Sequence, residues 1–192
     1  AAEASPVTTH LERVVGDDLC GMIGYRVSQD DSGDPRPPSW GHITCDGSVA
    51  NLESLWAARN AKYYPIAVAA ALEQEAVLRP ARGIVVQYQG EERALVDLDD
   101  WERLNLSLDE VLALPERIAE AFPDKQKLPD LAEIVKPYSL PELGFPEFLA
   151  KHELEGIGAP VVLAPATMHY SWPKGATLLG MGRGGLVPVA VD

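Results

Sequence analysis

Residues 40–60 combine a small-residue turn with the start of a helix, and this arrangement suits the binding of an anion. Asp46, Gly47 and Ser48 stand at the turn, directly before a helical pattern. The first N–H groups of a helix lack intrahelical partners and lie at the positive end of its dipole, so they favour a phosphate. Gly47 permits close approach of the backbone, and Ser48 adds a hydroxyl donor. Spacing alone favours the simpler interpretation that Asp46 or Ser48 caps an ordinary helix.

Two histidines and an acidic run could also do chemistry. His169 follows the apolar run 160–165 and precedes a helical segment, so it stands at the carboxyl end of a predicted strand, where open α/β sheets bind ligands. From the residues alone, a histidine that caps this helix is the favoured interpretation. His42, beside the opening turn, is interpreted as structural. The acidic run 97–100 is interpreted as a solvated loop, because its spacing is not that of a metal site.

Three blocks of sequence carry a resemblance to a known family. The first is 40–60, with Gly41-His42-Ile43, the small-residue turn and the closing Ala58-Arg59-Asn60; the second is 167–182, with His169-Tyr170-Ser171 and Lys174-Gly175-Ala176. Both resemble the group II pyridoxal-phosphate (PLP)-dependent amino-acid decarboxylases. The third, 100–110, is similar to an insert of the bacterial tyrosine decarboxylase branch. The resemblance runs from Thr8 to Asp192.

The resemblance implies roles for these residues. It assigns the cofactor phosphate to Gly47 and Ser48, and it implies that His169 stacks on the pyridine ring. Asp46 departs from the small neutral residue usual in the family, and since its carboxylate would repel a phosphate, we expect it to point away and cap its own helix. Thr44 and Asn51 are lesser candidates. The candidate cofactor-binding residues are Asp46, Gly47, Ser48 and His169, and the candidate catalytic residue is His169; no metal ligand is expected.

PLP-dependent decarboxylation also needs a Schiff-base lysine and an acidic partner for the ring nitrogen. The family carries these in Asp-x-His-Lys and Asp-Ala-Ala/Trp segments. None of the six lysines follows a histidine, and Lys174 matches the helix lysine of the family and not the catalytic one. We therefore expect an amino-terminal portion of a longer enzyme, whose partners are the remaining segment, a second subunit of a homodimer and an amino-acid substrate.

The expected function is decarboxylation of an aromatic, tyrosine-like L-amino acid. Aspartate or glutamate decarboxylation is the nearest alternative, because specificity depends on pockets that these motifs do not contain. A non-catalytic cofactor-binding or interaction fragment that lacks the Schiff-base lysine is an alternative of another class.

Hydrophobic spacing and turn residues predict the elements that must position these groups. The first is a helix from Thr8 or Thr9 to Ile23, with an apolar stripe that must be buried against the remaining segment or a second subunit. A helix from Ser48 is expected to stop near Pro65, before a further helical stretch to Leu78. The other predicted elements are a loop at 29–38, a short strand within 83–88, a helix from 107 or 109 to 122, a strand at 160–165 buried on both faces, a helix at 171–179 and a strand at 186–191.

The last three elements form a strand-helix-strand unit, which favours a parallel sheet in an α/β layer architecture. The resemblance implies the large domain of a fold type I (aspartate-aminotransferase-like) PLP enzyme, partial, as a three-layer α/β/α arrangement with a mostly parallel sheet. The predicted organisation is an N-terminal helix, 1–28, and the first part of the PLP-binding domain, 39–192, with an inserted excursion at about 80–150.

Composition excludes several other classes. The net charge of −13 would repel nucleic acid, and no basic cluster offers an exception. Cys20 and Cys45 are too few for a disulfide framework, which fits a reducing cytoplasm. The most apolar run, 66–72, is far shorter than the ~20 residues of a membrane span, and the N-terminus lacks the pattern of a signal peptide, so neither membrane insertion nor secretion is expected.

Overall fold

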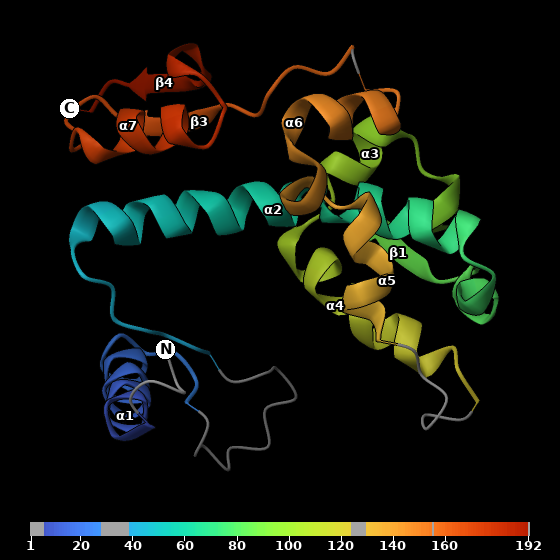
Figure 1. Ribbon diagram of the computed structural model, residues 1–192, viewed down its shortest axis with the longest axis horizontal. Helices are drawn as coiled ribbons and strands as arrows, with labels where there is room; N and C mark the ends of the chain where they lie inside the picture. Colours follow the sequence, from blue (N-terminus) through green and yellow to red (C-terminus); the bar gives the residue numbers. More distant parts are fainter. Residues whose placement is uncertain (1–5, 28–38, 124–129, 155, 192) are drawn as a thin grey trace. The chain divides into compact units, whose positions relative to one another are not determined.

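The computed structural model describes residues 6–27, 39–123, 130–154 and 156–191, and these form two compact units (Figure 1). The first unit is Ala1–Asn51 and the second is Leu52–Asp192. The predicted loop at 29–38 lies outside the described residues. The helices are α1 (Pro6–Met22), α2 (Gly47–Gln74), α3 (Asp100–Leu104), α4 (Leu108–Glu120), α5 (Leu131–Val135), α6 (Leu140–Lys151) and α7 (Ser171–Leu178). The strands are β1 (Val85–Tyr88), β2 (Glu91–Ala94), β3 (Val162–Pro165) and β4 (Leu186–Val189), and short 3-10 turns connect several of these elements.

In the first unit, the segment that leads to α2 runs along α1. Gly16 on α1 approaches Gly41 so closely that a Cβ at Gly16 would lie 2.6 Å from the Gly41 carbonyl oxygen, so only glycine fits there. The Ile43 N–H donates to the Glu12 carboxylate at 3.0 Å. The predicted first helix is thus confirmed, and its apolar stripe is largely exposed within the described residues, with Leu11, Leu19 and Met22 at its surface.

The helix α2 corrects the predicted stop near Pro65, because it continues without a break to Gln74. A proline inside a helix costs about 3 kcal/mol through the lost hydrogen bond and the ring clash. Every residue from Pro65 to Leu72 is buried, however. Since full burial of a large aliphatic side chain stabilises by about 1.5–3 kcal/mol, Ile66, Val68 and Leu72 together outweigh the cost of the proline.

Residues 80–150, which were predicted to form an inserted excursion, contribute much of the larger hydrophobic core of the second unit, and the excursion itself stays a prediction. The strand predicted within 83–88 is β1, and it pairs with β2 in an antiparallel hairpin, although no strand was predicted at β2. The turn residues Gln89 and Gly90 both have positive φ, at 52° and 86°, as a two-residue type I′ turn requires. The second half of α2 packs against this region in a cluster that includes Leu72, Leu78, Val86, Leu95, Leu114 and Ile118.

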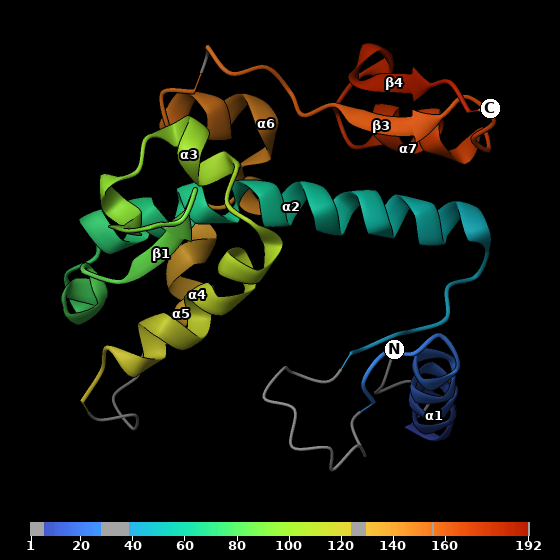
Figure 2. The same cartoon turned by 180° about the vertical axis from the view of Figure 1, so that it is seen from behind.

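The predicted strand-helix-strand unit is confirmed by β3, α7 and β4, with β3 and β4 parallel and Val162 opposite Leu186 (Figure 2). The prediction that this strand is buried on both faces was wrong for the described residues. Ala164 of β3 is buried, but Leu163 is 69% exposed. Within the described residues, no further strand pairs with β3 or β4. These residues are mostly helical, and their strands form two two-stranded sheets. The three-layer arrangement therefore stays a prediction.

Candidate functional site

Asp46 caps the N-terminus of α2. Asp46 Oδ1 accepts from the Val49 N–H at 2.9 Å, and the Asp46 carbonyl accepts from the Ala50 N–H at 3.1 Å. The Thr44 hydroxyl donates to the same carbonyl at 2.7 Å. The expected capping by Asp46 is therefore observed, and Thr44 supports the turn through its hydroxyl.

Gly47 and Ser48 supply the hydrogen-bond donors of this turn. As the first two residues of α2, they have N–H groups without carbonyl partners in the helix. A Cβ at Gly47 would meet nothing within 4 Å, so the backbone there is open to a ligand. Ser48 is half-buried. The turn thus offers two N–H groups and one hydroxyl beside a carboxylate that is already bonded to Val49.

His42 lies in the approach to this turn and stacks on Trp40, with ring centroids 4.9 Å apart and an interplanar angle of 29°. Both residues are exposed, so the interpretation of His42 as a structural residue stays a prediction.

His169 lies in the loop between β3 and α7, within the second unit, whereas Gly47 and Ser48 belong to the first. Its Nδ1 accepts from the Ser171 N–H at 3.3 Å and lies 3.0 Å from the Ser171 hydroxyl. The ring is exposed and is in contact with Tyr170, at a centroid distance of 4.2 Å and a tilt of 46°. His169 therefore caps α7 through one nitrogen and leaves the rest of its ring accessible.

Contacts between α2 and α7, which were not predicted from the sequence, hold the helix that follows His169. Arg59 donates to the Leu179 carbonyl at the end of α7, at 2.9 Å, and lies over the Phe145 ring at 5.6 Å. A Cβ at Gly175 would lie 3.0 Å from a methyl carbon of Leu55, so α7 packs closely on α2. Arg59 lies in the Ala58-Arg59-Asn60 motif, and this motif could have marked Arg59 as a candidate positioning residue.

The acidic run 97–100 is exposed at Asp97 and Asp99, as a solvated segment would be, but it contains the start of α3 and is not a plain loop. Asp99 accepts from the Glu102 N–H at 2.8 Å, while the Glu102 carboxylate accepts from the Asp99 N–H at 2.9 Å, which forms a capping box at the start of α3. Asp100 pairs with Arg103 at 3.1 Å. A carboxylate three residues before another acidic residue was the signal for this helix start. The described residues contain no group of three or more metal-ligating side chains.

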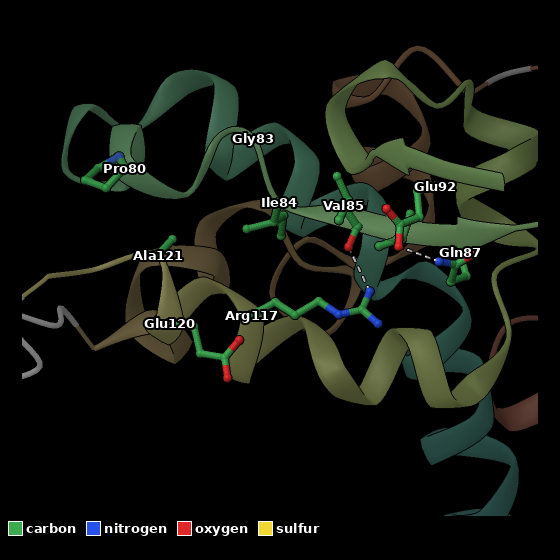
Figure 3. A pocket seen from close by; sticks show the side chains of 10 residues that line it. Pro80, Gly83, Ile84, Val85, Gln87, Glu92, Arg117, Glu120 and Ala121 are labelled. Atoms are coloured by element: carbon green, nitrogen blue, oxygen red, sulfur yellow. Dashed lines mark hydrogen bonds between the residues drawn. The ribbon is translucent and has the colours of Figure 1, made fainter.

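A hollow of about 570 Å³ lies between β1 and α4, and its lining includes none of the predicted site residues (Figure 3). The Arg117 side chain extends across it from α4 and donates to the Val85 carbonyl at 2.9 Å and to Glu110 Oε1 at 2.9 Å. Hydrogen bonds from Arg117 lower the pKa of Glu110, against the raising effect of burial, and a bond from the Gln87 N–H lowers it further. Because Glu110 already pairs with the guanidinium, this hollow offers no unpaired cation to an anionic cofactor.

Comparison with known proteins relates the whole chain to bacterial amino-acid decarboxylases. No protein-family model matches it. Over 192 residues it is 31% identical to the L-tyrosine decarboxylase of Enterococcus faecalis and 30% identical to that of Levilactobacillus brevis. These matches cover 100% of this chain and 23% of each relative, so the chain spans about a quarter of their length. The predicted resemblance to the bacterial tyrosine decarboxylase branch is thereby confirmed.

None of the helices in the described ranges is long and apolar enough to cross a membrane.

Proposed function

We propose that this chain is part of a PLP-dependent L-amino-acid decarboxylase whose substrate is an aromatic amino acid such as tyrosine. The observation that carries the proposal is the similarity to L-tyrosine decarboxylases along the entire chain, which includes the turn at Gly47 and Ser48 and the segment around His169. We place this enzyme in the cytoplasm as a homodimer.

In this proposal the start of α2 holds the cofactor phosphate. The donors there fit a phosphate, because Gly47 and Ser48 present N–H groups at the positive end of a 28-residue helix and Ser48 adds its hydroxyl. The Asp46 carboxylate is directed at its own helix through Val49, which limits its repulsion of the anion. Asp46 thus shapes the turn, while Gly47 and Ser48 bind.

His169 covers one face of the cofactor ring in this proposal. Its accessible imidazole, anchored at Nδ1, fits a flat aromatic ligand and limits the access of water to the reacting face. Bound PLP would supply the electron sink that accepts the electron pair released when the bond to the substrate carboxylate breaks. The Schiff-base lysine and the acidic partner of the ring nitrogen are placed in the remainder of the enzyme.

The β3-α7-β4 unit fits the three-layer fold type I arrangement that the family implies. Its helix covers one face of the strand pair, and Leu163, Val187 and Val189 are exposed on the strands. An apolar sheet face of this kind suits a sheet that is covered on both sides. We therefore propose that further strands and a second helical layer complete it in the intact enzyme.

The test is cofactor retention and carbon dioxide release by the full-length protein with L-tyrosine, L-aspartate and L-glutamate. Ser48→Asp should abolish cofactor retention, because a second carboxylate at the turn repels the phosphate. The matched control is Ser107→Asp, at the start of α4, where Ser107 caps the helix and aspartate caps equally well. Full retention of cofactor by Ser48→Asp would place the phosphate elsewhere.

His169→Ala should slow turnover more than it weakens cofactor binding. An unchanged rate would remove His169 from the site. Release of carbon dioxide from L-glutamate or L-aspartate in preference to L-tyrosine would contradict the proposed substrate class.

A further inference from the structure

We propose that Ser171 is a positioning residue for His169, which it holds in the neutral tautomer that carries its proton on Nε2. The tautomer follows from the hydrogen bonds alone. Its consequence for catalysis rests on the proposed function, in which His169 faces the cofactor and substrate.

The first step is the direction of the hydrogen bonds. A backbone N–H can only donate, so the Ser171 N–H, 3.3 Å from Nδ1, requires a lone pair on that nitrogen. The Ser171 hydroxyl lies 3.0 Å from the same Nδ1, and with a lone pair on that nitrogen the hydroxyl is the group that donates. In a neutral imidazole with an unprotonated Nδ1, the proton resides on Nε2.

The second step is the contrast in burial between the two residues. Ser171 is only 3% exposed and is the one buried polar residue in the described parts of the chain, whereas His169 is exposed. A buried anchor therefore holds one edge of an accessible ring. Tyr170, with its ring 4.2 Å away, restricts the rotation of the imidazole further.

The third step is what this arrangement can do. With Nδ1 occupied by Ser171, the ring presents Nε2–H as a hydrogen-bond donor on its accessible edge. A donor of this kind suits an anionic oxygen, and the carboxylate of an amino-acid substrate is the group that the proposed reaction would bring there. Without the anchor, the ring could present a bare acceptor nitrogen, which would repel that carboxylate.

The experiment is ¹⁵N NMR by magic-angle spinning on the full-length protein with labelled histidine, in which the His169 signals are assigned by their loss in His169→Gln. We expect an unprotonated, hydrogen-bonded Nδ1 and a protonated Nε2 in the wild type. Ser171→Ala removes the hydroxyl and leaves only the longer bond from the Ser171 backbone N–H, at 3.3 Å, to hold Nδ1 unprotonated. The Nδ1 signal should therefore shift, and a population with protonated Nδ1 should appear. Ser171→Thr keeps the hydroxyl and should retain the wild-type signals.

The matched control is Thr177→Ala, which removes a hydroxyl on the same helix that donates to the Pro173 carbonyl and should leave His169 unchanged. A protonated Nδ1 in the wild type would overturn the inference even if no variant folds. So would identical His169 signals in the wild type and a folded Ser171→Ala.

Kinetics separate this inference from the proposed function. With decarboxylase activity present, Ser171→Ala should lower kcat roughly tenfold with little change in KM or in cofactor retention, because the donor is misplaced and the phosphate site is intact. Unchanged kcat would overturn the positioning role. A wild-type protein without any decarboxylase activity would contradict the proposed function, while the NMR result would still decide the tautomer.

Discussion

The β1–β2 hairpin and the β3–β4 pair are both sheets of two four-residue strands, but they are covered very differently. In the hairpin, Val86 is 1% exposed and packs into the larger core with Leu114 of α4. In the parallel pair, α7 covers one face, and Leu163 is 69% exposed on β3. The hairpin is thus completed by neighbouring elements of its own unit, whereas the parallel pair presents an apolar face to solvent.

The edges differ as well. The outer edge of β1 is satisfied by an ion pair on α4, since the Gln87 N–H donates to Glu110 and the Val85 carbonyl accepts from Arg117. Side chains therefore occupy positions that a neighbouring strand would otherwise fill, which protects an exposed edge from pairing with another chain. The hairpin is therefore covered at both its face and its edge, whereas the strands of the parallel pair keep an exposed apolar face.

The largest expected effect compares one leucine from each region. Leu114→Ala should lower the free energy of unfolding by about 2–5 kcal/mol, because it leaves a cavity at a fully buried position. Leu163→Ala should lower it by less than about 0.5 kcal/mol if that face stays exposed. Urea unfolding of the two variants measures both. A large loss at Leu163 in the full-length protein would show that another layer covers β3 there.

The next effect tests how the parallel pair is attached to α2. Gly175→Val should destabilise by about 1–3 kcal/mol, because a Cβ there would already lie 3.0 Å from Leu55 and a branched side chain overpacks the contact. Gly184→Val is the matched control, since a Cβ at Gly184 meets nothing within 4 Å. Equal unfolding midpoints for the two variants would contradict close packing of α7 on α2.

Many of the helices and strands could be predicted from the sequence, because local residue patterns determine them. The helices α1, α4 and α7, the strand within 83–88 and the parallel strand-helix-strand unit were predicted from spacing and capping residues. Pro65 was misread, because its neighbours determine whether a helix continues through a proline and their burial cannot be read from local propensity. The hairpin was missed because Gln89-Gly90 is a weaker turn signal than Asn-Gly.

The candidate site divides in the same way. Capping by Asp46 and the place of His169 before α7 follow from local sequence, and both were predicted. The contact of Arg59 with Leu179 joins residues 120 positions apart, and the Glu110–Gln87 bond joins residues from different elements. Such long-range partners depend on how the elements pack, so residue spacing alone could not predict them.

A smaller effect concerns the edge of β1. Glu110→Gln should destabilise by about 1 kcal/mol near neutral pH, because neutral hydrogen bonds to Arg117 and Gln87 replace charge-assisted ones. Since the pKa of Glu110 is lowered from 4.5 in the folded state, its contribution is complete above that value and is lost as the pH falls through the folded pKa. The difference between wild type and variant should therefore shrink below about pH 4.5. A pH-independent difference would contradict the role of this charge.

The smallest expected effect is a gain in stability at the turn of the hairpin. Gln89 adopts a φ of 52°, which is strained for most residues but is tolerated by asparagine, so Gln89→Asn should stabilise by about 0.5 kcal/mol. Gln89→Val should destabilise, because a branched Cβ is poorly tolerated at positive φ. Thermal unfolding measures both changes. Val86 packs β1 into the core, so the gain should raise the unfolding temperature of the whole unit. An unchanged unfolding temperature with a more rigid turn would show that the hairpin unfolds separately.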